Sequence, residues 1–285
     1  MPEADALRGD PAITPAYARL AASFQRLYNL QHLQAMAGWD QAAKMPPAGN
    51  EARAAALAEV ATLMHRLRTE PALRADLDSA STESLTALQR ANLREMRREW
   101  AMSNALPESL VERAQLARSR CEHAWRTQRP ANDWAGFLSN FREVLATARE
   151  EAQRLSQQSG LRPYDALMDR FEPGMTCAQL DRVFGEVRQW LPGLIRQVRD
   201  KQSRETVLQP QGPFPIEAQH RLCESVMRLL GFDFEAGRLD VSAHPFSGGV
   251  PEDVRLTTRF RGDEFLVSLM GTVHETGHGR YEQNL

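Results

Sequence analysis

The sequence has few cysteines, and their placement excludes the structures that cysteines most often stabilise. The three cysteines, Cys121, Cys177 and Cys223, lie far apart and form no Cys-x-x-Cys pair. An odd number of widely spaced cysteines fits neither a disulfide framework nor a cysteine-ligated zinc site. We therefore expect reduced thiols and a cytoplasmic protein.

Long hydrophobic runs and a targeting segment are also lacking. The longest apolar stretch near the C-terminus, FLVSLMGTV, is too short to cross a bilayer. The first ten residues, MPEADALRGD, are polar and acidic, unlike a secretory signal peptide. We expect no membrane partner, and we expect residues 1–12 to be disordered.

Neither sign of charge dominates the sequence. The 35 Lys and Arg residues nearly balance the 37 Asp and Glu residues, giving a formal net charge of −2. This balance gives no electrostatic reason to expect a nucleic acid or an acidic membrane as partner. The remaining composition, 42% hydrophobic and 25% charged, is that of an ordinary globular protein.

Helical periodicity is the main pattern in the first 231 residues. Apolar residues recur every three or four positions, and capping residues mark the starts of several segments. The stretch GWDQAAKMPPAGN interrupts the pattern and predicts a loop. The predicted helices begin at Thr14-Pro15, just after Asn50, near Ser81, near Asn104-Pro107, at Asn132-Asp133 and Thr176, and at Pro213. Pro192 inside one of them predicts a kink or a break.

The composition of the sequence changes after Gly231. Two segments, RLDVSAH and DVRLTTRF, have the composition of short strands, and the loop SGGVPED joins them. Asp263 is then expected to cap a final helix whose buried face comprises Phe265, Leu266, Leu269, Met270 and Val273. Residues 1–285 are therefore expected to form one mainly α domain, with a short β-hairpin before the last helix.

The last predicted helix carries His274-Glu275-Thr276-Gly277-His278. Histidines four residues apart lie on one helix face, close enough to bind one metal ion. Glu275 is turned about 100° from His274, so it can border the site as general base for the attacking water. A chance match is the competing interpretation, at roughly one in a hundred for a chain of this composition.

A zinc site of this kind needs a third protein ligand, and the sequence offers no clear candidate. The positions that would carry Gly and His in metzincins hold Tyr281 and Asn284, which excludes that class. Glu282 shares the helix face but lies about 12 Å from His274 along the axis, too far to bind the same ion. The remaining solution is a glutamate from a helix further along, outside this chain.

Three motifs together resemble the carboxypeptidase Taq family of zinc metallocarboxypeptidases. They are His244-Pro-Phe, Asp253-Val-Arg255-Leu-Thr257, and His274-Glu-Thr-Gly-His278 continued by GRYEQN. The upstream segments WDQAAKMPPAG and YDALMDRFEPGMT are also similar to the family. The resemblance runs from about Trp39 to the last residue and is far more specific than HExxH alone.

The resemblance implies a multi-helix, zincin-like (gluzincin) carboxypeptidase fold that is truncated here. It implies that the chain is the N-terminal portion of a longer, homodimeric enzyme that removes C-terminal residues from peptides. His274 and His278 would bind zinc, or cobalt or another divalent metal, and Glu275 would be catalytic. His244, Asp253 and Arg255 would line the groove or support the site. A glutamate ligand and a carboxylate-binding arginine segment of the family have no counterpart in this sequence.

Several alternatives remain open at this stage. The chain is either the first part of a carboxypeptidase, inactive alone, or a truncated, non-catalytic binding or assembly module of the same fold. A different HExxH endopeptidase would leave the His-Pro-Phe and Asp-x-Arg-x-Thr segments unexplained. His244 could be a packed loop histidine, and Arg255 or Arg259 could pair with an acidic residue instead of a substrate carboxylate.

Overall fold

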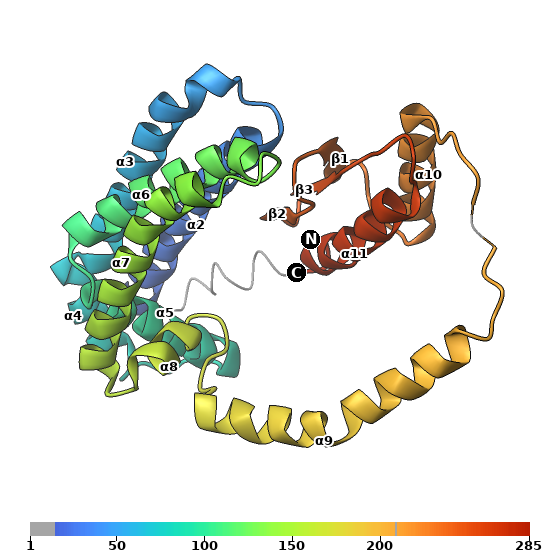
Figure 1. Cartoon of the computed structure of the whole chain (residues 1–285). Coiled ribbons are helices and arrows are strands. Elements are labelled where there is room, and N and C mark those ends of the chain that lie inside the picture. Colours follow the sequence, from blue (N-terminus) through green and yellow to red (C-terminus); the bar gives the residue numbers. More distant parts are fainter. Residues whose placement is uncertain (1–14, 209) are drawn as a thin grey trace. The chain divides into compact units, whose positions relative to one another are not determined.

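The chain folds mainly into helices, with one small sheet (Figure 1). Our computed structural model describes residues 15–208 and 210–285, so the expected disorder of residues 1–12 and the capping role of Thr14 lie outside the described residues. The chain divides into two compact units: the residues up to 145 together with 212–285, and residues 146–211. The expectation of a single domain over 1–285 stays a prediction.

The first unit begins with a bundle of helices. Tyr17, Leu20 and Leu77 are fully buried where the first of these helices packs on its neighbours. The backbone N–H groups of Ala16 and Tyr17 donate to the carboxylate of Glu83, which places a negative charge at a helix N-terminus. The bundle elements are α2 (Pro15–Ala43), η1 (Pro47–Gly49), α3 (Asn50–Thr69), α4 (Pro71–Ala80), α5 (Ala87–Asn104), α6 (Glu108–Gln128) and α7 (Trp134–Ser159), whose second half belongs to the other unit.

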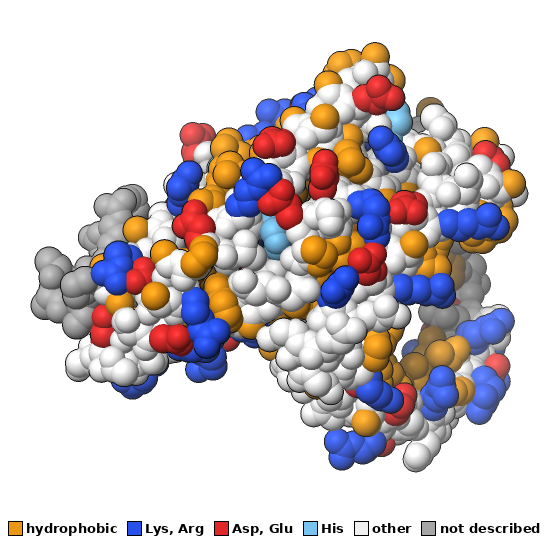
Figure 2. Space-filling model, turned by 90° about the vertical axis from the view of Figure 1, so that its left-hand side faces the viewer, with side chains coloured by type: hydrophobic (Ala, Val, Ile, Leu, Met, Phe, Trp, Pro, Cys, Tyr) orange, Lys and Arg blue, Asp and Glu red, His pale blue; other side chains and the backbone are white. Residues whose placement is uncertain are grey.

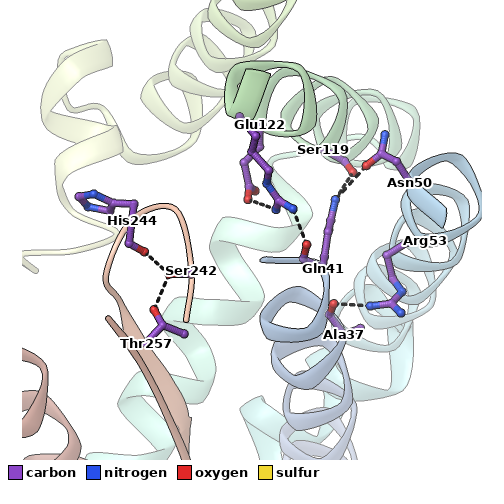
Figure 3. Close-up of polar contacts among 10 residues, drawn as sticks. Ala37, Gln41, Asn50, Arg53, Ser119, Glu122, Ser242, His244 and Thr257 are labelled. Atoms are coloured by element: carbon purple, nitrogen blue, oxygen red, sulfur yellow. Dashed lines mark hydrogen bonds and ion pairs between the residues drawn. The ribbon is translucent and has the colours of Figure 1, made fainter. Parts of the chain in front are cut away.

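The predicted loop at GWDQAAKMPPAGN is wrong over its first half, because α2 continues to Ala43. Tertiary contacts outweigh the poor helix propensity of Gly38. The side-chain amide of Gln41 donates to Asn50 and to Ser119 of α6, so this last turn of α2 is fixed in the bundle (Figure 3). Only the short segment between Ala43 and η1 is irregular.

The helix predicted to start near Ser81 begins later. Ser81 follows the end of α4 as its C-cap, and α5 starts at Ala87 with Thr86 and Gln89 forming a capping box. The predicted starts at Asn104-Pro107 and Asn132-Asp133 are confirmed by α6 and α7. The stretch 79–86 contains several Ser and Thr residues, and each of them can cap a helix. The sequence therefore did not single out Thr86 as the cap of α5.

The remainder of the first unit is a three-stranded sheet flanked by α10 (Ile216–Leu229) and α11 (Leu266–Glu282). Strands β1 (Gly237–Val241), β2 (Ser247–Val250) and β3 (Asp253–Thr258) have the order β1-β3-β2. The two predicted strands pair in parallel, with Arg238 opposite Arg255. The hairpin is instead formed by β2 and β3, since the Ser-Gly-Gly-Val segment predicted as a loop is itself a strand.

The buried face of α11 differs from the prediction. Leu266 and Met270 are exposed, Met270 at 62%, and the buried residues of this helix are Ser268, Thr272, Glu275, Thr276 and Gly279. Small side chains on this face let α11 lie directly on β3 and β2. Asp263 does not cap the helix, because it pairs with Arg261.

The second unit contains the end of α7, α8 (Pro163–Met168) and α9 (Cys177–Gln202). The predicted capping box of Thr176 and Gln179 is confirmed. The carboxylate of Asp165 accepts from the backbone N–H of Cys177 at 2.8 Å and from Arg162 at 2.9 Å. Helix α9 continues through Pro192 without a break, and its axis bends in Figure 1.

Charged side chains of both signs are interspersed on the face of the molecule shown in Figure 2. Among the described residues, no helix is both long enough and apolar enough to cross a membrane.

Candidate metal centre

The two histidines of the HExxH segment lie on the exposed face of α11 and converge on one point. Their Nε2 atoms are 3.3 Å apart, and their rings meet at 81°. This arrangement follows from the helix, which places residues four apart one above the other. The predicted pairing of His274 with His278 is therefore present in the folded chain.

The separation of these nitrogens fits a shared metal ion. Two nitrogens each about 2.0–2.1 Å from a tetrahedral ion lie about 3.3–3.4 Å apart, and the Nε2 atoms meet that distance without movement. A hydrogen bond between the two rings fits the same distance. A metal titration distinguishes this hydrogen bond from a shared metal ion. The donor set of two imidazoles suits zinc, copper, iron or nickel.

Glu275 follows His274 but lies on the inner side of the helix, with 7% of its surface exposed. No residue of 15–208 or 210–285 forms an ion pair or hydrogen bond with its carboxylate. A third ligand is not supplied either: within those ranges no three His, Cys, Asp or Glu side chains gather closely enough to hold a metal ion. The described residues thus present two candidate ligands, with a carboxylate next to them in the sequence.

The start of α11 is fixed by buried hydrogen bonds. Thr258 at the end of β3 donates its hydroxyl to the carbonyl of Ser268. The Ser268 hydroxyl lies 2.8 Å from the side-chain oxygen of Gln219 on α10, and the Gln219 amide donates to the carbonyls of Phe214 and Arg261. Gln219 thereby joins α10, the preceding loop and the entry to α11. Nothing in the sequence indicated this role, because a glutamine on a helix is usually exposed.

The end of α11 is fixed as well. Gln283 accepts from the backbone N–H of Asp233 and donates to its carbonyl, which ties the helix to the turn after α10. Gly279 lies against Leu256 and Phe232, whose atoms would be 3.0 Å from an added Cβ. Gly277, beside the histidines, has open space where a Cβ would lie. Of these two glycines, Gly279 is the one that another part of the chain approaches closely.

His244 lies on an exposed loop between β1 and β2 whose backbone is fixed by two hydroxyls (Figure 3). Ser242 donates to the carbonyl of His244 and lies 2.7 Å from the hydroxyl of Thr257. Thr257 accepts from the backbone N–H of Phe246. The Asp-x-Arg-x-Thr motif thus supports the His-Pro-Phe loop directly.

Asp253, Arg255 and Thr257 share one face of β3, and the opposite face packs on α11. Arg255 donates from Nε and Nη2 to the two carboxylate oxygens of Asp253, and its guanidinium lies 4.8 Å from the ring centre of Trp39 on α2. Arg259 is exposed, and within the described part of the chain no acidic residue pairs with it. The roles predicted for Asp253 and Arg255 stay predictions.

Comparison with known proteins identifies the family of this chain. Residues 19–285 match the carboxypeptidase Taq (M32) metallopeptidase family. The chain belongs to the carboxypeptidase Taq family. Thermostable carboxypeptidase 1 of Thermus thermophilus is 36% identical over 282 residues, which cover 95% of this chain and 55% of that protein. Carboxypeptidase 1 of Bacillus subtilis is 28% identical, covering 92% and 52% respectively.

Solved structures of carboxypeptidases agree with the fold. Metallocarboxypeptidase 1 of Trypanosoma cruzi matches with a TM-score of 0.83 and 48% identity, over 94% of this chain and 55% of that one. The M32 carboxypeptidase of Deinococcus radiodurans matches with a TM-score of 0.80 and 28% identity. This member of the carboxypeptidase Taq family therefore spans about half the length of its relatives. Because the family consists of metallopeptidases, it implies a divalent metal ion.

Proposed function

We propose that this chain carries the first part of the active site of a zinc-dependent metallocarboxypeptidase that removes C-terminal residues from peptides. The observation that carries the proposal is the 3.3 Å separation of the His274 and His278 Nε2 atoms, on a helix that also presents Glu275. The two imidazoles would hold the ion. When bound, the ion would polarise the scissile carbonyl and make water more acidic.

Glu275 has the catalytic role in this proposal. Its carboxylate would accept a proton from the attacking water and deliver it to the nitrogen of the departing residue. His244, Asp253 and Arg255 would shape the substrate groove, with zinc or another divalent metal as cofactor, peptides as substrates, and a homodimer as the assembled state.

The carboxylate of the substrate needs a cation, and Arg259 suits that need better than Arg255. Arg255 is already neutralised by Asp253, whereas Arg259 is exposed. A guanidinium that has no acidic partner can bind a peptide carboxylate through two hydrogen bonds.

Residues 1–285 alone are proposed to be inactive, because the described part of the chain supplies two of the three protein ligands that a catalytic zinc site requires. The test measures release of C-terminal amino acids from N-blocked peptides by the purified chain, with and without a chelator. We expect no chelator-sensitive release. Robust release that the chelator stops and Glu275→Gln abolishes would refute this part of the proposal.

A second candidate function is a non-catalytic binding or assembly module of the same fold. Exposed apolar residues flank the histidines on the same face of α11, namely Val267, Met270 and Tyr281. A fusion protein distinguishes the two functions. It joins this chain to the part of the Trypanosoma cruzi relative that this chain does not span. If the catalytic proposal is right, the folded fusion should have carboxypeptidase activity and its Glu275→Gln variant should not. If the chain is a binding or assembly module, neither protein should have this activity.

A further inference from the structure

Helix α9 has an apolar stripe that nothing in its own unit covers. None of its residues is buried, although the helix is 26 residues long. The stripe repeats every three or four positions and comprises Leu180, Val183, Phe184, Val187, Trp190, Leu191, Leu194, Ile195 and Val198. Phe184 is 56% exposed and Trp190 is 55% exposed. Such a stripe is the usual mark of a helix that packs on a partner.

Local interactions explain why α9 forms but not why its stripe is apolar. Its amino end has the capping box of Thr176 and Gln179, and Asp165 accepts the backbone N–H of Cys177. Arg199 and Lys201 lie in the last turn, where positive charge is favourable. Most helical stability in proteins nevertheless comes from packing of the apolar face. A contiguous exposed stripe therefore indicates a surface that is covered in the complete assembly.

The relatives that this chain matches are longer than the chain itself. The match to the Thermus thermophilus protein leaves only 5% of this 285-residue chain uncovered. That is fewer residues than the 26 of α9. Helix α9 therefore lies at least partly within the shared fold. The same match leaves 45% of the relative without a counterpart in this chain.

We propose that the apolar stripe of α9 is the docking surface for an apolar helical face in the part of the family fold that this chain does not span. Rows of side chains three and four apart form ridges that pack into the grooves of another helix. The polar side of α9 carries both acidic and basic residues, whereas a helix that lies on a membrane has a mainly basic polar face. This inference goes beyond the proposed activity and does not require a metal ion.

The direct test compares hydrogen–deuterium exchange of residues 177–202 in this chain alone and in the fusion to the remainder of the Trypanosoma cruzi protein, both without added metal. We expect exchange to slow by roughly tenfold or more in the fusion. The paired change Phe184→Glu with Leu194→Glu should remove that protection. The matched change Gln189→Glu with Arg196→Glu, on the opposite side of the helix, should leave it intact. Equally fast exchange in a folded fusion would overturn the proposal.

A second measurement needs only the 285-residue chain. If the stripe docks a separate segment, Phe184→Glu with Leu194→Glu should shift the thermal midpoint by less than about 2 °C, because exposed side chains contribute little. A large fall would mean that the stripe belongs to this chain's own core. Protection of residues 177–202 that rises with protein concentration, or on adding phosphatidylserine vesicles, would assign the stripe to a second copy or to a lipid surface. Either result would overturn the proposal.

Discussion

The guanidinium of Arg255 lies over the indole ring of Trp39, 4.8 Å from its centre, and Arg238 lies 5.5 Å from the same ring. Arg238 and Arg255 are neighbours in the parallel register of β1 and β3. Arg238 pairs with Asp240, and Arg255 pairs with Asp253. In each pair the carboxylate lies two residues away on the same strand. Two like charges can lie near one aromatic ring because each has a carboxylate beside it. This contact joins α2 to the face of the sheet opposite α11.

Trp39→Ala should therefore destabilise the chain without weakening metal binding. The loss should be about 2–4 kcal/mol, from two cation–π contacts and the packing of a half-buried ring. Chemical denaturation of Trp39→Ala and Trp39→Phe measures it, with the phenylalanine variant keeping most of the stability. Unchanged stability of Trp39→Ala would show that the contact is incidental.

The two glycines near the histidines make a matched pair on one helix. Gly277→Ala places a methyl group in open space and should stabilise the chain by about 0.5–1 kcal/mol through helix propensity. Gly279→Ala forces a methyl group against buried Leu256 and Phe232 and should be about 1–3 kcal/mol less stable than Gly277→Ala. Thermal unfolding of both variants checks the order. Equal stability would mean that α11 can move away from β3.

Thr257 should act through its hydroxyl and not through its size. Thr257→Val leaves the backbone N–H of Phe246 without its partner and removes one of the two contacts of the Ser242 hydroxyl, which keeps the carbonyl of His244. The change should cost about 1–3 kcal/mol. Thr257→Ser keeps the hydroxyl and should lose less. Exchange of the amides of residues 242–246 should speed up only in the valine variant. Similar behaviour of both variants would assign the effect to packing.

The charge of Asp165 should make the second unit sensitive to acid. The Cys177 thiol, the Cys177 backbone N–H and Arg162 lower the pKa of Asp165 from 3.8 to about 2. A carboxyl whose folded pKa lies below its unfolded value stabilises the fold above about pH 4, and this contribution is lost as the pH falls toward 2. A ¹³C NMR titration of the carboxyl checks the value, and Cys177→Ala should raise it. A titration midpoint near 4 in the wild-type chain would contradict the network.

The periodic helices and the HExxH pair followed from local sequence, because both depend on residues three or four positions apart. The continuation of α2 through Gly38 did not, since it depends on Gln41 meeting Ser119, which is 78 residues away. The inner face of α11 was misjudged for a related reason. Apolar Leu266 and Met270 suggested burial, but Ser268, Thr272 and Gly279 allow the closer approach to the sheet. Sequence patterns also could not show that Arg255 faces Trp39.

The central claim is that α11 presents two of the ligands of a divalent metal site. Calorimetric titration of Zn²⁺ into the metal-free chain tests it most directly, with His274→Ala, His278→Ala and Glu275→Gln as variants. We expect one ion per chain, bound more weakly than about 1 μM because the described chain offers only two ligands. Binding should be lost in either histidine variant and kept in Glu275→Gln. Zinc binding that survives removal of both histidines, or no binding at all in the wild-type chain, would contradict it.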